Sequence, residues 1–213
     1  MSTRSALVIG GSGLVGRQLL QNLLESDKYS QIRVLSRTDL GFKHAKLEVI
    51  IFDFDFPKLE LVIGEDVYCC LGTTMKKAGS KANFYKVDFT YPTQIAAAAL
   101  KNGSKRFSIV TAMGADAKSS FYYNRVKGEV EAALENMKFE SLFIFRPSLL
   151  LGVRPDSRLG EQIGEKFAKI FKPLIPAKYR AIEASKVAKA MLSITTSKIK
   201  GSVVYESEVL QEF

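Results

Sequence analysis

The sequence contains no tryptophan, one histidine (His44) and two cysteines, which are the adjacent Cys69 and Cys70. Structural zinc is held by spaced sets of cysteine and histidine, so this composition predicts no metal site. A disulfide between neighbouring residues is strained and rare, and we therefore interpret the pair as two reduced thiols. Because reduced thiols are typical of the cytosol, we expect a cytoplasmic protein.

Long apolar runs are also missing. The first run, Ala6 to Ile9, is too short for the apolar part of a signal peptide, and Gly10 ends it. No run reaches the roughly 20 residues that a membrane-spanning helix needs. We expect neither a secretory signal nor a membrane partner.

Basic charge is in excess, but it is not concentrated. The chain has 31 Lys and Arg residues against 22 Asp and Glu residues, a net charge of +9, and no basic tail or block. A dispersed excess attracts anionic small molecules as well as polyanions. We expect no nucleic-acid partner. The alternative of a polyanion-binding module predicts an affinity that falls steeply with salt.

Short apolar runs alternate with helical patterns over residues 1–150. Such alternation is typical of parallel strands joined by right-handed crossovers. We predict an α/β, doubly wound parallel-sheet Rossmann fold in a single domain, 1–213, with a cofactor-binding core (1–150) and a short substrate or partner region (151–213). The predicted strands are Ala6–Ile9, Ile32–Leu35, Leu47–Phe52, Asp66–Leu71, Arg106–Thr111, Leu142–Phe145 and Ser202–Tyr205. The predicted helices are Leu14–Leu24, Asn83–Asn102, Ser120–Met137, Gly160–Phe171 and Ala184–Thr195.

A glycine-rich turn joins the first predicted strand to the first helix. Gly10, Gly13 and Gly16 fit the spacing G-x-x-G-x-x-G. In this context the first glycine permits a tight turn, the second lets a diphosphate approach the main chain, and the third lets helix pack on strand. A plain strand–helix turn is the alternative. The predicted cofactor residues here are Gly10, Gly11, Ser12, Gly13, Leu14, Val15 and Gly16.

The second predicted strand ends at Leu35-Ser36-Arg37. NAD-specific sites usually carry an acidic residue there, whereas an arginine offers a planar fork to a 2′-phosphate. Ser36 and Arg37 therefore predict NADP(H) as the cofactor, unless Arg37 is only a solvated surface residue. Asp53, after the third strand, is either an acceptor for the adenine amino group or a turn residue.

Tyr123 and Lys127 are four residues apart on a predicted helix and therefore lie on one face. A nearby ammonium makes a phenol a better proton donor and acceptor near neutral pH. Tyr123 could then protonate a carbonyl oxygen, and Lys127 could also bond the nicotinamide ribose. Tyr122 has Val126 at the same offset, so the pairing selects Tyr123. Thr111, at the end of the fifth strand, is the candidate third catalytic group or, equally, a threonine that caps the backbone.

These motifs together resemble the short-chain dehydrogenase/reductase superfamily, and in particular its atypical branch. The similarity rests on GGSGLVG, the strand-end LSR, Cys70-Leu-Gly-Thr73 and Y-N-R-V-K. Val126–Glu131, Phe145–Ser148 and Leu150–Gly160 are similar to the Tat-interacting-protein-like members. The resemblance covers nearly the whole chain and implies an NADPH site. It places Leu71, Gly72 and Thr73 against the cofactor, and Pro147 and Ser148 beside the nicotinamide.

Two departures from the superfamily pattern keep two functions open. The fifth strand ends Thr111-Ala112-Met113 instead of in a serine-rich segment, and the C-terminal region is short. One hypothesis is an NADPH-dependent reductase of a small carbonyl substrate. The other is an NADPH-binding regulator that orders a surface for a protein partner, for example the loop from Arg154 to Gly160. The sequence allows a monomer or a homodimer.

Overall fold

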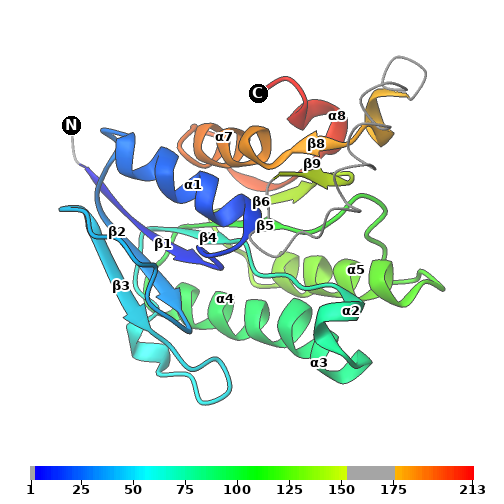
Figure 1. The fold of residues 1–213 in the computed structure, drawn as a ribbon, viewed down its shortest axis with the longest axis horizontal. Coiled ribbons are helices and arrows are strands. Elements are labelled where there is room, and N and C mark those ends of the chain that lie inside the picture. Colours follow the sequence, from blue (N-terminus) through cyan, green and yellow to red (C-terminus); the bar gives the residue numbers. More distant parts are fainter. Residues whose placement is uncertain (1–2, 153–175) are drawn as a thin grey trace.

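The computed structural model describes residues 3–152 and 176–213, and the predicted helix Gly160–Phe171 and the loop from Arg154 lie outside these ranges. One seven-stranded sheet runs through the molecule in the order β3-β2-β1-β4-β5-β6-β9 (Figure 1). Each neighbouring pair of strands is parallel. The strands are β1 (Arg4–Ile9), β2 (Tyr29–Ser36), β3 (Leu47–Ile51), β4 (Asp66–Cys69), β5 (Arg106–Val110), β6 (Ser141–Arg146) and β9 (Gly201–Glu206). The predicted α/β fold class is confirmed.

Two layers of helices cover the sheet. α1 (Leu14–Glu25) and α7 (Ala184–Thr195) lie on one face, and α4 (Tyr91–Lys101) and α5 (Tyr122–Asn136) on the other (Figure 1). The side chains of β1 divide between two cores: Ala6 and Val8 pack with α1 and α7, whereas Leu7 and Ile9 pack with α4. This follows from the alternation of side chains along a strand. A strand covered on both faces needs apolar residues throughout, which explains the uninterrupted apolar run of β1.

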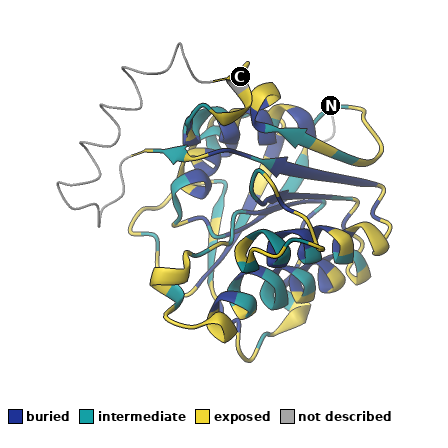
Figure 2. Ribbon diagram, turned by 90° about the vertical axis from the view of Figure 1, so that its right-hand side faces the viewer, coloured by how far each residue is buried: buried dark blue, intermediate teal, exposed yellow. Residues whose placement is uncertain are grey.

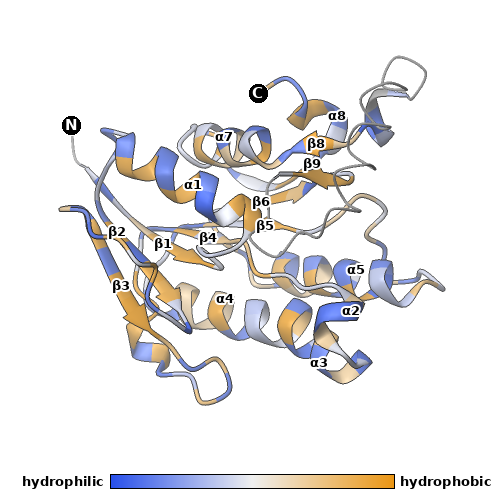
Figure 3. Cartoon of the chain, viewed as in Figure 1, coloured by the Kyte–Doolittle hydropathy of each residue, from blue (hydrophilic) through white to orange (hydrophobic). Residues whose placement is uncertain are grey.

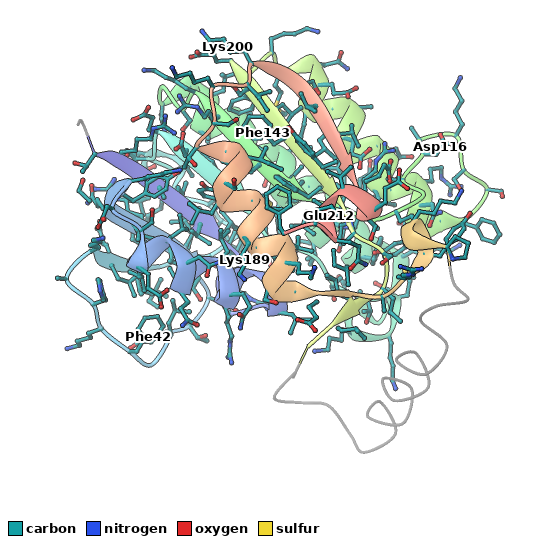
Figure 4. The ribbon with its side chains drawn as sticks, turned by 90° about the horizontal axis from the view of Figure 1, so that it is seen from above. Phe42, Asp116, Phe143, Lys189, Lys200 and Glu212 are labelled. Carbon is teal, nitrogen blue, oxygen red and sulfur yellow. The ribbon has the colours of Figure 1, made fainter. Side chains whose placement is uncertain are left out.

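Burial and hydropathy follow this layered arrangement. The inner strands are mostly buried, the edge strands β3 and β9 are half-buried or exposed, and the helices are exposed on their outer faces (Figure 2). The helices carry apolar residues toward the sheet and polar residues toward solvent (Figure 3). Phe143 of β6 lies in the core beneath α7, whereas Lys189 on α7 is exposed (Figure 4). α7 and β9 thus belong to the same core as the N-terminal elements.

The segment expected as one helix from Asn83 to Asn102 has three parts. α3 (Lys81–Tyr85) runs into a π-helical turn (Lys86–Thr90), and α4 follows. A π turn inserts an extra residue into a helix, and such turns are frequent at functional sites. Here the π turn carries a buried carboxylate, Asp88.

Several short elements were not predicted. α2 (Met75–Ala78) is capped by the Thr74 side chain and ended by Gly79, and α8 (Ser207–Leu210) follows β9. β7 (Leu150–Leu151) and β8 (Ile182–Glu183) form a separate parallel pair. Within the described ranges, 3-10 turns occupy Leu59–Leu61 and Ala177–Tyr179. Elements of two to four residues are too short for a hydrophobic period to reveal them.

The strand order reverses between β1 and β4. From β1 the chain continues to β2 and β3 on one side, and from β4 to β5 and β6 on the other. Connections after β1 and β4 therefore leave the sheet in opposite directions and open a crevice at the carboxyl ends of these strands. In open α/β sheets ligands bind at this switch point.

Candidate functional site

The turn between β1 and α1 has no room for side chains at two of its glycines. Gly10 has φ +79°, and a Cβ on it would lie 2.6 Å from the carbonyl carbon and oxygen of Cys70. A Cβ on Gly16 would lie 2.1 Å from the carbonyl oxygen of Gly10. Gly10 and Gly16 are therefore required for the close packing of strand and helix.

The start of α1 faces outward from this turn without a side-chain cap. Its N-cap is Gly13, which has no side chain to bond the first N–H groups, and the first helical turn has no acidic residue. These N–H groups lack partners within the helix, and the helix dipole gives this end a partial positive charge. The geometry fits an anionic group such as the diphosphate of a dinucleotide.

A cavity of about 470 Å³ borders this helix start at the switch point. It is lined by residues that follow β1 and β4, by the end of β5, by the π turn and by α5. The lining residues are Ser12, Gly13, Leu14, Val15, Arg17, Cys70, Leu71, Gly72, Thr73, Thr74, Lys77, Asp88, Val110, Thr111, Tyr123, Lys127 and Leu150. The structure thus brings the glycine turn, the loop after β4 and the Tyr–Lys pair to one cavity.

Tyr123 and Lys127 lie one helical turn apart on α5 and both line the cavity. Tyr123 is 37% exposed, and its ring packs against Phe84 with the ring centroids 5.5 Å apart. The adjacent Tyr122 is engaged elsewhere, because its hydroxyl donates to the carbonyl oxygen of Lys81 at 2.9 Å. A phenol and an ammonium therefore share one wall of the cavity.

Lys127 is 4% exposed and is paired with Asp88. Its Nζ lies 2.7 Å from Asp88 Oδ1. Burial by itself lowers the pKa of the Lys127 ammonium, but the carboxylate of Asp88 opposes this effect, and the pKa lies above its usual value. Asp88 Oδ2 also accepts the backbone N–H of Thr73 at 3.0 Å, so one carboxylate joins α5 to the loop after β4.

Thr111 lines the cavity, but its hydroxyl is already engaged. It donates to Glu131 Oε1 at 2.5 Å. Glu131 in turn accepts from Arg146, which also pairs with Glu206 at 2.9 Å. In this arrangement the Thr111 hydrogen does not point to a carbonyl group in the cavity, so its role as the third catalytic group stays a prediction.

The residues predicted for the adenosine end lie outside this cavity. Arg37 is exposed, and Ser36 is buried with its hydroxyl accepting the N–H of Thr38 at 3.4 Å. Asp53 Oδ1 accepts the N–H of Asp55 at 2.8 Å, which is the turn alternative considered for this residue. The Asp53 carboxylate thus bonds the turn through Oδ1, and its contact with adenine stays a prediction.

Pro147 and Ser148, predicted beside the nicotinamide, are buried and are not among the cavity-lining residues. The Ser148 hydroxyl donates to the carbonyl oxygen of Arg180 and accepts from Ser207 at 3.0 Å. The main-chain oxygen of Pro147 accepts the N–H of Met113 at 2.9 Å. These two residues connect β6 to the loop after β5 and to the C-terminal segment.

A second cavity, of about 650 Å³, lies between α1 and the loop after β2. It shares Ser12 and Arg17 with the first cavity and also includes the predicted Gly11. The Arg17 Nε donates to the carbonyl oxygen of Ser12 at 3.0 Å, which holds this guanidinium between the two cavities. The lining residues are Gly11, Ser12, Arg17, Leu20, Gln21, Leu24, Glu25, Thr38, Asp39, Leu40, Phe42 and His44.

Sequence reasoning missed Asp88 and Arg17. Asp88 carried one visible signal, since it is a lone carboxylate in an otherwise uncharged helical stretch from Val87 to Leu100. A charged residue inside such a stretch is rarely buried unless it is paired. Arg17 follows the third glycine directly, but an arginine in the first turn of a helix is equally common on a solvated surface.

The sheet, its switch point and the glycine-bordered cavity define a dinucleotide-binding α/β protein. A profile of the family described as NAD(P)H-binding matches residues 10–198. The chain belongs to this NAD(P)H-binding family, within the atypical short-chain dehydrogenase/reductases that its motifs resemble.

Individual proteins agree with this assignment. Protein HTATIP2 of Rattus norvegicus is 40% identical over 177 residues, covering 78% of this chain and 71% of the relative. Protein FMP52, mitochondrial, of Candida albicans is 33% identical over 208 residues, covering 93% and 91%. The solved structure of MoeE5 in complex with UDP-glucose and NAD has a TM-score of 0.73 at 15% identity, covering 94% of this chain and 74% of that one. At that identity the likeness shows the fold alone.

The expected cytoplasmic location is wrong. The Candida albicans relative and further fungal relatives of the same name are named mitochondrial. Cys69 and Cys70 are both free thiols, as predicted, but free thiols do not distinguish the cytosol from other reducing compartments. Over residues 3–152 and 176–213, no helix is long and apolar enough to cross a bilayer.

Proposed function

We propose that the protein is an NADPH-dependent reductase of small carbonyl compounds. The observation that carries this proposal is the placement of Tyr123 and Lys127 on one wall of the cavity that the glycine turn borders. A cofactor whose diphosphate lies at the start of α1 would extend along this cavity toward the phenol. The cofactor supplies a hydride to the carbonyl carbon of the substrate.

The residues of the chain supply binding and the proton. The Tyr123 hydroxyl gives its proton to the carbonyl oxygen, so that the product is an alcohol, and the resulting phenolate regains a proton from water. The Lys127 ammonium lies beside this phenol and stabilises the negative charge that develops on it. Thr111 would orient the carbonyl only by turning its hydroxyl hydrogen from Glu131 to the substrate.

The preference for NADPH is proposed from Ser36 and Arg37. The exposed Arg37 stands directly after β2, where the adenosine ribose is expected in this fold. A guanidinium at that point can bond a 2′-phosphate through two parallel N–H groups. The first experiment is a titration with NADPH and with NADH, followed by nicotinamide fluorescence. Tighter binding of NADPH supports the proposal, and binding of neither contradicts it.

The proton donor is tested with Tyr123→Phe. Loss of the phenolic proton should reduce carbonyl reduction by roughly 10²–10⁴-fold while NADPH binding is retained. Tyr122→Phe is the matched control, since that hydroxyl donates to the Lys81 carbonyl outside the cavity, and it should keep its activity.

If carbonyl reduction survives Tyr123→Phe, the proposed acid is wrong. If NADPH binds and no carbonyl compound is reduced by either protein, the regulator with a protein partner takes the place of the enzyme. The titration and the substrate assay therefore separate the cofactor claim from the turnover claim.

A further inference from the structure

The π turn between α3 and α4 places a carboxylate where the sequence shows only an uncharged helical run. Asp88 has a fully buried side chain. A buried carboxylate is costly unless charged and polar partners surround it. Its partners are the Lys127 ammonium at 2.7 Å and the Thr73 N–H at 3.0 Å. Asp88 therefore connects the Tyr–Lys helix with the loop after β4.

Gly72 leaves this ion pair open to the cavity. A Cβ at that position would stand 3.5 Å from Asp88 Oδ1 and 3.6 Å from Lys127 Nζ, in contact with both charges. Asp88 and Lys127 both line the cavity. The pair is thus part of the cavity wall, although it is shielded from bulk water.

Other charged and titratable groups near Lys127 do not replace Asp88. Tyr123, on the same helix, carries a phenol and not a carboxylate, so it does not supply the counter-ion. Burial raises the pKa of the Cys69 thiol on β4 to about 11, so this thiol is neutral near pH 7. Arg17 and Lys77 line the same cavity and are cations. Among the described cavity-lining residues, Asp88 is the carboxylate that faces Lys127.

We propose that Asp88 is the positioning residue of the site, which keeps the buried Lys127 ammonium charged and fixed beside Tyr123. Only the expected effect on carbonyl reduction rests on the proposed reductase function. Without a counter-ion, burial opposes the charged form of a lysine strongly enough to remove its proton near neutral pH. A neutral Lys127 would no longer stabilise the phenolate that Tyr123 forms.

The test variant is Asp88→Asn, which keeps the shape and an oxygen acceptor for the Thr73 N–H but removes the charge. At pH values between the lowered pKa of Lys127 in the variant and its raised pKa in the wild type, only the wild type keeps a charged Lys127. In this range the rate of carbonyl reduction by the variant should fall about tenfold per pH unit. Its activity should recover as the pH falls. A purely structural defect would lower activity equally at all pH values.

A second readout needs neither cofactor nor turnover. In the wild type the folded pKa of Lys127 is raised, so its contribution to stability is present below the unfolded value of about 10.4 and is lost only above the raised value. In Asp88→Asn the folded pKa lies below the unfolded value. The variant is then destabilised at low pH. It regains stability in the pH window between the lowered folded pKa of Lys127 and its unfolded value of about 10.4.

The melting-temperature gap between wild type and Asp88→Asn should therefore narrow by roughly 3 °C per pH unit within that window. The double variant Asp88→Asn/Lys127→Met has no titrating group at either position and should lack this narrowing. Asp55→Asn is the matched control, because it breaks the ion pair with Lys86 of the same π turn at the surface.

The outcomes are distinct. A gap that narrows in Asp88→Asn, but not in the double variant or in Asp55→Asn, supports the proposal even if no carbonyl substrate is found. A gap that stays constant with pH overturns it. If the melting-temperature gap narrows but the pH profile of carbonyl reduction is the same in Asp88→Asn and in the wild type, Asp88 does hold Lys127 charged. The proposed role of Lys127 in the reaction would then be refuted.

Discussion

At the scale of single residues, the proposed preference for NADPH depends on Arg37. It is exposed at the end of β2, whereas Arg33 on the same strand donates to Glu48 at 2.8 Å. A hydrogen bond to a charged group contributes about 1.5–3 kcal/mol. Arg37→Ala should therefore weaken NADPH binding by roughly 10–100-fold and leave NADH binding nearly unchanged.

Nicotinamide fluorescence titrations measure both affinities. Arg33→Ala is the control, because it removes an arginine of the same strand whose side chain is paired away from the predicted ribose position. Equal losses for NADPH and NADH in Arg37→Ala would contradict a 2′-phosphate contact.

Some residues of the site could be predicted because their spacing alone places them together. Tyr123 and Lys127 are neighbours on any regular helix. Asp88 could not be predicted in the same way, because its contact with Lys127 depends on a π turn and on the packing of α5 against that turn. The bond from the Thr111 hydroxyl to Glu131 could not be predicted either, because Glu131 comes from a different element.

At the scale of elements, the turn after β1 offers a test with a matched backbone. Gly10 and Gly41 both have φ +79°, but a Cβ on Gly41 meets nothing within 4 Å, whereas one on Gly10 overlaps the Cys70 main chain. In both Gly→Ala variants the left-handed conformation should lower the free energy of unfolding by about 1 kcal/mol. Gly10→Ala should lose roughly 1–3 kcal/mol more through the overlap.

Urea denaturation gives both free energies of unfolding, and NADPH titration shows whether the turn still binds the cofactor. Equal destabilisation by Gly10→Ala and Gly41→Ala would mean that the turn relaxes around a methyl group and that its tightness is not required.

The regular elements were predictable and the short ones were not. α7 begins and ends where its helical pattern predicts, and the seven strands of the main sheet all fall on predicted apolar runs. The β7–β8 pair and α8 depend on contacts between distant parts of the chain. The order of the strands in the sheet also follows from tertiary packing, which no local pattern contains.

At the scale of the whole molecule, cofactor binding should stabilise the native state. A ligand that binds only the folded protein adds about 2.7 kcal/mol at a concentration of 100 times its Kd. For a chain of 213 residues this corresponds to a rise in melting temperature of roughly 5–10 °C. Differential scanning fluorimetry with NADPH measures this rise, and Arg37→Ala should reduce it. No rise at saturating NADPH would contradict a cofactor site in the folded protein.

The packing of α7 against α1 has a consequence for how the protein is made. The buried face of α1, with Leu19, Leu20 and Leu23, belongs to the same core as Val187 and Met191 of α7. During synthesis on the ribosome, the part of this face that packs against α7 stays uncovered until the segment beginning at Ala184 has emerged. The nascent nucleotide-binding half therefore exposes an apolar surface that chaperones can bind, and the N-terminal layer closes only after the C-terminal helix arrives.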